Sequence, residues 1–458
     1  MNKKSFLQLS VTVVHYIIVV TVCLLTNACS NDDGDTTLET LSLEHNLYIV
    51  DNDTVPYDFN EMTMPLNATD EQICSALEEY SMTMLAEYSQ DTENNTILSP
   101  MNATLMYSMI SCMTDETSGN DCYKQMGLEN YDVNDVNSYC RKLNYHARQY
   151  ENTSVEGSKF SMSNNCWIQE KESVYKSFIS TTKSFGINVK GTDLQNRTGL
   201  DRIKQSLGES ISSITNGTEM TFAGNVTSLV TSSLDLQKKW KYKISYISGD
   251  TIFNNADGTI STCRKIGGTV SVNYSKQETF DMFELPYSDD NFSLYIVYPQ
   301  SSYFLNQSIA SIQNKSLEKC INDLSTTTIN IRVPAISLDG TTELYPSEKA
   351  QSTSIKPFYQ AKLYKASPKA FSIGNTYQAY HIELNPQATS INIVGTALIT
   401  IEEKNQKIAE DNTTAPRPYP GGTVKIPTIH IEHPFILLIR NNNLKTIVYA
   451  CCIKDLKQ

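Results

Sequence analysis

The chain has 458 residues and a formal net charge of −13 at pH 7, with 40% hydrophobic and 19% charged residues. The acidic balance excludes a protein that binds nucleic acid or anionic lipid through its overall charge, because like charges repel. The hydrophobic content is sufficient for one large core, so disorder is expected only towards the ends of the chain.

The start of the chain is typical of a secretory signal. Two lysines precede an apolar stretch over residues 7–25, which is followed by Thr-Asn-Ala and then Cys29. A small residue before a cysteine resembles a bacterial lipobox, although the threonine and asparagine replace its usual apolar and small residues. We expect residues 1–28 to be a signal peptide and Cys29 to be the lipid-attachment residue. An uncleaved membrane anchor is the alternative.

Residues 29–67 are polar and acidic, which predicts a linker between lipid and domain. The sequence Ser-Asn-Asp-Asp-Gly-Asp directly after the cysteine is similar to the acidic tag that directs lipoproteins of gut Bacteroides-type bacteria to the cell surface. A solvated linker is the plainer interpretation, and the two are compatible. We expect a secreted protein, lipid-anchored to the bacterial outer membrane at the cell surface, that contacts the membrane only through this anchor.

An amphipathic helix is predicted over residues 70–88. Thr69 and Gln72 form a candidate capping box before it. Apolar residues then recur at helical spacing: Ile73, Leu77, Tyr80, Met84 and Tyr88. Order is therefore expected from the start of this helix, in a single domain over residues 68–458.

Later segments change to the strand period. Residues 292–297 and 328–333 alternate in the way that β-strands require. Two apolar runs, 434–439 and 446–453, flank three asparagines and predict a buried hairpin. Helices dominate the first half and strands the second, without a regular repeat, which predicts an α+β domain.

The sequence has no motif of a known catalytic or cofactor site. GxSxG, HExxH, P-loop and GxGxxG patterns are all missing. The only histidine cluster, His430 and His433, would place its side chains on opposite faces of a strand. Nine cysteines remain after Cys23 and Cys29, without a CxxC, so buried thiols are expected and disulfides are possible. We therefore expect no enzyme activity, no cofactor and no metal.

Eight short motifs resemble, in family order, the serpin (serine protease inhibitor) family. Residues 95–100 resemble the Asn-x-x-x-Ser-Pro segment that opens the helix beneath the main sheet, and residues 229–240 resemble the strand that ends in a tryptophan. The other six are residues 165–168, 215–217, 283–287, 298–299, 333–334 and 433–435. The resemblance implies a serpin fold, which is α+β with three mixed or antiparallel sheets, and an exposed reactive loop at about residues 386–430.

The resemblance also implies a function and a partner. An inhibitory member is cleaved in its loop by a serine or cysteine protease, and the loop then inserts into the main sheet as a new strand and traps the acylated protease. The alternative is a non-inhibitory surface lipoprotein that acts as a binding or structural module. A target protease is the expected partner of a monomeric protein that does not bind nucleic acid.

The hinge of the loop determines whether it inserts. The matching residues are Pro386, Ala388, Thr389, Ser390, Ile391, Asn392 and Ile393. Thr389, Ile391 and Ile393 would face the core, and Ser390, Asn392 and Val394 the solvent, as an inserted strand requires. However, Pro386 replaces a glutamate, Ala388 replaces a glycine, and branched residues replace small alanines. The proline stiffens the hinge and the bulk slows insertion, so kinetics decide between inhibitor and substrate.

The usual loop length, counted from Ala388, implies a scissile bond near Glu402 and Glu403. A shift of one or two residues would involve Ile401 or Lys404. A second register, with residues 395–397 as the hinge, moves the bond to about Ala409.

The segment over residues 405–427 is longer than the stretch that the family needs after the scissile bond. They are rich in proline and glycine and are expected to be a flexible extension. Trp240 and Ser232 are expected where the loop enters the sheet. Ser232 stands at the position of a buried asparagine, and Cys451 at that of a glycine.

Overall fold

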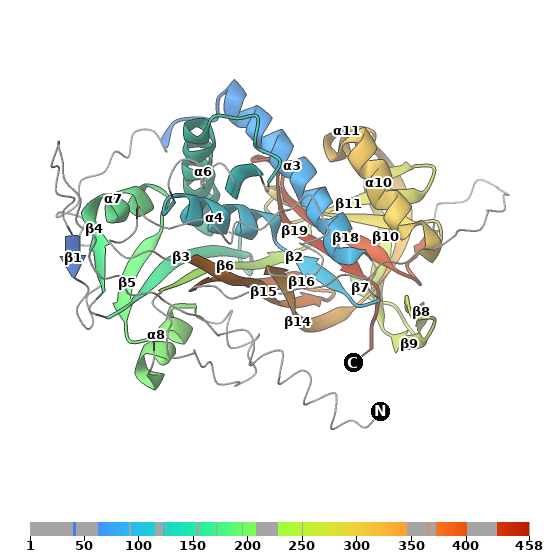
Figure 1. Cartoon of the computed structure of the whole chain (residues 1–458). Coiled ribbons are helices and arrows are strands. Elements are labelled where there is room, and N and C mark those ends of the chain that lie inside the picture. The colour runs from blue at the N-terminus through green and yellow to red at the C-terminus, as the bar shows by residue number, and fades with distance from the viewer. Residues whose placement is uncertain are drawn as a thin grey trace, which may run out of the picture.

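The computed structural model describes residues 40–42, 63–90, 93–114, 122–124, 126–152, 155–170, 172–194, 196–207, 228–249, 251–345, 365, 372–400 and 428–457. Its helices are α3 (Ala68–Ser89), α4 (Pro100–Ser111), α6 (Val133–Arg148), α7 (Lys176–Ser184), α8 (Arg197–Leu207), α10 (Leu305–Lys315) and α11 (Leu317–Asn322). Short 3-10 turns are η1 (Gln149–Asn152) and η2 (Ser302–Phe304). Helices α3, α4 and α6 lie together on one side of the sheets (Figure 1).

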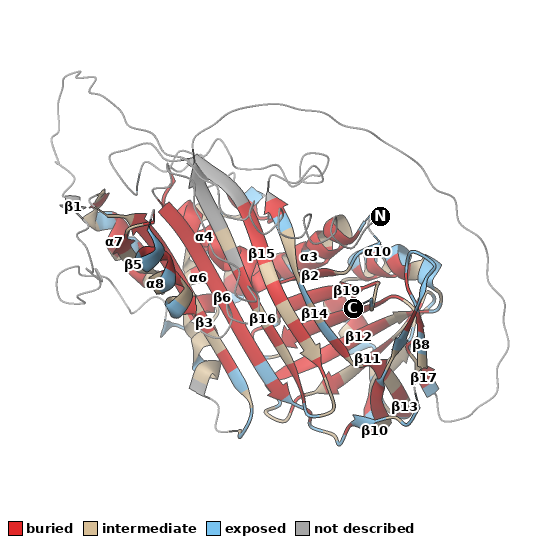
Figure 2. Cartoon of the chain, turned by 90° about the horizontal axis from the view of Figure 1, so that it is seen from below, coloured by how far each residue is buried: buried red, intermediate tan, exposed pale blue. Residues whose placement is uncertain are grey.

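A six-stranded sheet forms one layer of the fold. Its order is β14 (Ile336–Tyr345), β15 (Ser372–Leu384), β16 (Ala388–Thr400), β6 (Ser228–Lys239), β3 (Lys159–Gln169) and β5 (Asn188–Thr192). Neighbours are antiparallel except β3 and β5, which are parallel. Figure 2 shows β16 inside this sheet, with strands on both of its sides.

A nine-stranded sheet forms the second layer. Its path is β17 (Thr428–His430), β13 (Ser325–Pro334), β10 (Lys265–Lys276), β11 (Phe280–Pro286), β12 (Phe292–Pro299), β18 (Phe435–Asn441), β19 (Thr446–Ile453) and β2 (Thr96–Leu98), with β7 (Ser245–Tyr246) on β10. Two small sheets pair β1 (Thr40–Ser42) with β4 (Ser173–Tyr175), and β8 (Thr251–Asn254) with β9 (Ile260–Cys263).

The long strand β10 explains why two of the three expected sheets form one network. It pairs with β13 from Lys265 to Tyr274 and with β11 from Tyr274 to Lys276. The strand therefore passes from one set of partners to the other without a break. The α+β expectation is confirmed, as is the terminal hairpin, formed by β18 and β19.

The predicted first helix is confirmed, but its capping residues differ from the expectation. The side chain of Asn67 accepts a hydrogen bond from the Asp70 amide at 2.9 Å, and the Asp70 carboxylate accepts one from the Asn67 amide at 2.8 Å. Asn67, not Thr69, is therefore the N-cap. Two reciprocal bonds satisfy donors at the start of the helix, so the helix begins two residues earlier than the sequence pattern suggested.

The main core lies between the two sheets and beneath α3, α4 and α6. A second cluster joins β12, β18 and β19 to α3, α10 and α11. Because of this second cover, residues 292–297 are buried on both faces of β12, although their alternation resembled a half-buried strand.

Nine cysteines are free in the described chain, eight of them buried and Cys263 partly exposed, which confirms the expectation of buried thiols for these residues.

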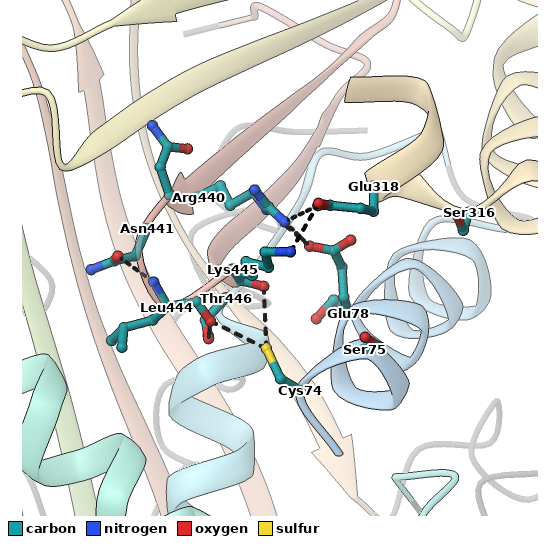
Figure 3. A network of polar contacts seen from close by, with 12 residues as sticks. Cys74, Ser75, Glu78, Ser316, Glu318, Arg440, Asn441, Leu444, Lys445 and Thr446 are labelled. Atoms are coloured by element: carbon teal, nitrogen blue, oxygen red, sulfur yellow. Dashed lines mark hydrogen bonds and ion pairs between the residues drawn. The ribbon is translucent and has the colours of Figure 1, made fainter. Parts of the chain in front are cut away.

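A partly buried ionic cluster connects helices α3 and α11 to the hairpin of β18 and β19 (Figure 3). Arg440, 4% exposed, donates to Glu78 at 2.9 Å and to Glu318 at 2.5 Å. Lys445 binds the other oxygen of Glu318 at 3.1 Å. Burial raises the pKa of Glu78, and the charge of Arg440 opposes that rise. The arginine therefore keeps two helices in register with the terminal hairpin.

Candidate functional site

The predicted hinge and the first part of the predicted loop form the strand β16. It pairs with β6 from Ala388 opposite Lys239 to Ile399 opposite Ser228. On its other side it pairs with β15 from Thr389 opposite Leu384 to Thr400 opposite Ser372. An exposed loop was expected here, and the structure instead shows the inserted state. Insertion completes the backbone hydrogen bonds of two neighbouring strands, which favours this arrangement.

A tight turn joins β15 to β16 at Asn385, Pro386 and Gln387. The Asn385 amide donates to the Ala388 carbonyl at 3.1 Å. The Asn385 side chain accepts from the amides of Gln387 at 2.8 Å and Ala388 at 3.0 Å. Proline suits the turn position after Asn385 because it fixes φ and no amide donor is needed there. The residue that stiffens the hinge is thus compatible with the inserted form.

Alternate side chains of β16 face the core. Thr389, Ile391 and Ile393 are each at most 1% exposed, which confirms their predicted inward orientation. Ser390 and Asn392 are half-buried on the outer face. The expectation for Val394 is wrong, because it is 3% exposed. Val394 packs on the outer face in a cluster that α8 covers, together with these residues: Trp167, Leu194, Leu200, Ile203, Leu207, Leu229 and Tyr377.

Trp240 lies beside the turn at one end of β16. Its indole nitrogen donates to the Asn385 carbonyl at 3.0 Å. Its ring stacks on Tyr287 with 5.2 Å between the ring centroids. Burial raises the pKa of the Tyr287 hydroxyl far above its ordinary range, so the phenol stays neutral. Trp240 therefore lies where the loop turns into the sheet, as the sequence suggested.

A buried ion pair lies next to this end of the strand. Lys238, opposite Thr389 in the register, contacts Asp289 at 2.5 Å, and the two side chains are 0% and 3% exposed. The Lys238 ammonium also lies 4.6 Å from the centroid of the Phe292 ring. The charge of Lys238 is thus paired and covered by an aromatic face, as buried charges require.

Ser232 lies in a polar cluster halfway along the sheet, not beside Trp240. Eight residues of strand separate the two, which is about 26 Å. Asn102 donates to the Ser232 carbonyl and hydroxyl at 2.8 and 2.9 Å, and Ser232 donates to Asn164 at 2.7 Å. The expected joint position is wrong, because Ser232 lies in the interior of β6 and Trp240 follows the last residue of that strand.

Gln378 on β15 completes the polar cluster. It accepts from the Ser99 amide at 2.9 Å and donates to the Ser99 carbonyl at 2.8 Å and to Asn102 at 3.1 Å. Both Gln378 and Ser232 lie opposite Gly395 of the inserted strand. Sequence reasoning identified Ser99 only as a helix cap and missed the asparagines and the glutamine, since nothing local to them indicates a shared site.

Residues 395–397, the alternative hinge, lie in the interior of β16, whereas Ala388 of the preferred hinge is its first residue. The described strand ends at Thr400, so Ile401, Glu402, Glu403 and Lys404 lie outside the described residues, as do Cys29 and residues 215–217. Cys451 is fully buried in β19, and burial raises the pKa of its thiol.

No group of His, Cys, Asp and Glu side chains suited to a metal ion occurs among the described residues. Within that same part of the chain, none of the helices combines the length and the apolar character that a membrane crossing needs. The inserted strand β16, its neighbours β15 and β6, and the turn beside Trp240 are the candidate functional site.

Comparison with known proteins gives the same fold. A family model described as Serpin (serine protease inhibitor) matches residues 75–453. One curated relative is Iripin-8 of Ixodes ricinus, which is 20% identical over 40% of this chain and 43% of that protein. Another is intracellular coagulation inhibitor 2 of Tachypleus tridentatus, which is 22% identical over 73% of this chain and 78% of that protein. The match to Iripin-8 thus spans less than half of the length of Iripin-8.

Two solved structures agree with the α+β serpin fold. Cleaved Serpin 42Da superimposes with a TM-score of 0.69 at 14% identity, over 85% of this chain and all of that one. The thermophilic serpin tengpin in its latent state superimposes with a TM-score of 0.66 at 16% identity, over 86% of this chain and all of that one. The fold class expected from the sequence is confirmed.

Proposed function

The chain belongs to the serpin family, and from that premise we propose that it inhibits a serine or cysteine protease through cleavage of its loop and insertion of β16. Serpins are generally inhibitors rather than catalytic enzymes, and this chain has the expected acceptor sheet. The observation that supports the proposal best is the register of β16, which is continuous with β6 from Ala388 to Ile399.

The proposed chemistry belongs to the protease, and the trap belongs to this chain. The nucleophile of the protease attacks the carbonyl carbon of the scissile residue, the peptide C–N bond breaks, and the new amine leaves with a proton. The carbonyl carbon then remains as an ester or thioester on the protease. Insertion from Ala388 to Thr400 moves this acylated end by about 40 Å along the sheet. Trapping succeeds where this movement is faster than hydrolysis of the acyl bond.

The scissile bond is expected beyond the described part of β16, which extends to Thr400. The usual loop length, counted from Ala388, places it between Ile401 and Lys404. We propose that this segment contains the scissile bond. A glutamate-preferring or an elastase-like protease is the first choice for a target in vitro.

A denaturant-resistant complex on gels, formed with such proteases, tests the proposal. Ile391→Asp places a charge at a buried position of β16 and is expected to convert trapping into plain cleavage. Asn392→Asp is the matched control, because Asn392 is next to Ile391 in the chain and its side chain is half-buried on the outer face of the sheet. The proposal fails if neither the wild type nor Asn392→Asp forms the complex while both are cut.

The hinge variants give a second readout of the same proposal. Replacing Pro386 by Glu, and Ile391 and Ile393 by Ala, removes a fixed φ and reduces the bulk that must pass between two strands. The ratio of trapped complex to cleaved product is expected to rise. A flat ratio, with cleavage still near Glu402, would mean that neither stiffness nor bulk limits trapping.

A non-inhibitory binding or structural role is the second candidate. The observation that favours it is the turn at Pro386, which already fits the inserted state with all of its other amides bonded. A protein that inserts its loop before it meets a protease has no trap left. Loop cleavage of such a protein would leave its thermal stability unchanged.

For location, we propose a lipid anchor at Cys29 and display of the monomeric domain on the outer surface of a bacterium. The support is the signal-like start, the cysteine and the acidic segment that follows it. Cys29→Ala is expected to abolish palmitate labelling and partitioning into outer-membrane detergent extracts. Unchanged labelling would refute the anchor.

A further inference from the structure

The strand β1 belongs to the segment that the sequence predicts to be a linker. Its three residues, Thr40–Ser42, lie within residues 29–67. Its backbone pairs antiparallel with that of β4, and Ser42 lies opposite Ser173. Residues 43–67 separate β1 from the first residue of α3. A part of the chain well before the first long helix is therefore attached to the domain.

The strand β4 is held in place by the core of the domain. Val174, its middle residue, is 0% exposed and belongs to the main core. Helix α7 follows β4 directly and buries Phe178 and Ile179 in the same core. In the part of the chain that the structure describes, β1 is the only strand that pairs with β4. A fixed strand with an open edge is a template for main-chain hydrogen bonds to a further segment.

The strand registers place the β1–β4 pair at one end of the six-stranded sheet. Ile168 of β3 and Ile399 of β16 both lie opposite Ser228 of β6. The last residue of β3 is Gln169, and β4 begins four residues later. The pair therefore lies at the end of β16 that is distant from Trp240. Figures 1 and 2 show β1 and the β8–β9 hairpin at opposite ends of the molecule.

This pairing shortens the tether between a lipid on Cys29 and the domain. Eleven residue steps lead from Cys29 to Thr40, and they reach at most about 40 Å when extended. A linker that joined the domain only at Ala68 would have 39 steps and would reach about 130–140 Å. Docking of β1 therefore makes the β4 end of the domain its point of attachment.

We infer that residues 40–42 dock on β4 as an added strand and hold the β4 end of the domain towards the membrane. The orientation rests on the proposed lipid anchor at Cys29, whereas the docking does not. Under the proposed function, insertion of β16 then carries the acylated end of the loop to the end of the domain that faces the membrane. The turn beside Trp240 faces away from the membrane.

A pair of engineered cysteines tests the docking in the full-length chain with Cys29→Ala, so that the result does not depend on a lipid. Ser42→Cys with Ser173→Cys joins two opposite residues. Opposite Cα atoms of antiparallel strands are about 4.5–5.5 Å apart, which suits a disulfide. Ser42→Cys with Ser177→Cys is the control, because Ser177 is exposed on α7 four residues further along. A free linker would reach both positions equally.

The link to position 173 is expected in most molecules after mild oxidation, and the link to position 177 in few, as measured by peptide mapping. Thr40→Pro with Leu41→Pro removes two successive amides, one of which faces β4 in any antiparallel ladder. This double substitution should reduce the link at position 173 to the level of the control. Leu47→Pro with Tyr48→Pro, later in the same linker, should leave it unchanged. Equal yields at positions 173 and 177 would overturn the docking.

Energy transfer to the membrane tests the orientation. Lipidated protein with Cys263→Ser, which removes the one partly exposed thiol of the described chain, carries a donor dye at Ser177→Cys or at Ile260→Cys. Ile260 is 63% exposed on the β8–β9 hairpin. The protein is bound to phosphatidylcholine vesicles with an acceptor on the lipid headgroup. Transfer from position 177 should be at least about two-fold greater, because the strand β16 between the two ends is about 40 Å long.

The variant with prolines at positions 40 and 41 should lose this difference. Equal transfer from positions 177 and 260 in the unaltered linker would overturn the orientation.

The two tests separate this inference from the proposed anchor and function. A link at position 173 in a protein that never binds vesicles would refute the anchor and the orientation, and would leave the docking standing. Equal links at positions 173 and 177 in a protein that binds vesicles and traps a protease would refute the docking, and would leave the anchor and inhibition standing.

Discussion

Truncation of Ile393 is expected to destabilise only the state in which β16 is inserted. Ile393 is 0% exposed in the core between the sheets, so Ile393→Ala leaves a cavity. Such a change costs about 2–5 kcal/mol. Before insertion the same side chain lies outside the sheet, and its truncation is expected to cost almost nothing.

The expected shift in midpoint follows from the size of the domain. At about 2.1 cal/mol/K per residue, a domain of roughly 390 residues has an unfolding entropy near 0.8 kcal/mol/K, so 2–5 kcal/mol corresponds to about 2–6 °C. Asn392→Ala, on the half-buried outer face, is the control and is expected to shift the midpoint by less than about 1 °C.

Calorimetry on loop-cleaved protein, and on freshly refolded uncut protein, measures both states. The reasoning would be refuted by an equal shift for Ile393→Ala and Asn392→Ala in cleaved protein, because then β16 would not separate a buried face from an open one. A shift of the full size in freshly refolded protein would show that β16 is already inserted before cleavage.

Three further outcomes are expected. Asn385→Ala removes the acceptor of two turn amides and should lower the stability of the inserted state by about 1–3 kcal/mol in denaturant titrations, with recovery in Asn385→Asp. Arg440→Met should cost about 3–5 kcal/mol, because Glu78 stays buried without its partner, and Glu78→Gln in the same chain should recover part of the loss. His433 stacks on Tyr298 with 4.4 Å between the ring centroids. Burial lowers the pKa of its imidazole from the ordinary value of 6.5. The unfolded state then binds the proton more tightly than the folded state does. The midpoint temperature of unfolding should therefore fall as the pH drops below about 6.5, and His433→Gln should reduce this dependence on pH.

The local features of the hinge were predictable from the sequence. Period-2 alternation identified Thr389, Ile391 and Ile393 as one face of a strand, and their burial confirms it. Alternation depends only on the geometry of an extended chain, in which successive side chains point to opposite sides. Helical spacing of apolar residues identified the helix at residues 70–88 in the same local way. Two apolar runs identified the terminal hairpin, while the exact helix cap was not found.

The long-range partners of those features were decided by the tertiary structure. Val394 is buried because α8, about 190 residues earlier in the chain, covers the outer face of the sheet at that point. Ser232, Asn164, Asn102 and Gln378 meet because three strands and a helix place them at one level of the sheet.

The sequence by itself determined that residues 388–400 are able to form a strand, and the tertiary structure decided that this strand lies between β15 and β6. Strand-forming ability is a property of neighbouring residues, since it depends on side chains two positions apart. A central position depends on hydrogen-bonding groups of two other strands, β15 beside it and β6 about 160 residues earlier. No local pattern encodes that opening in the sheet, because it exists only after the rest of the domain has folded around it.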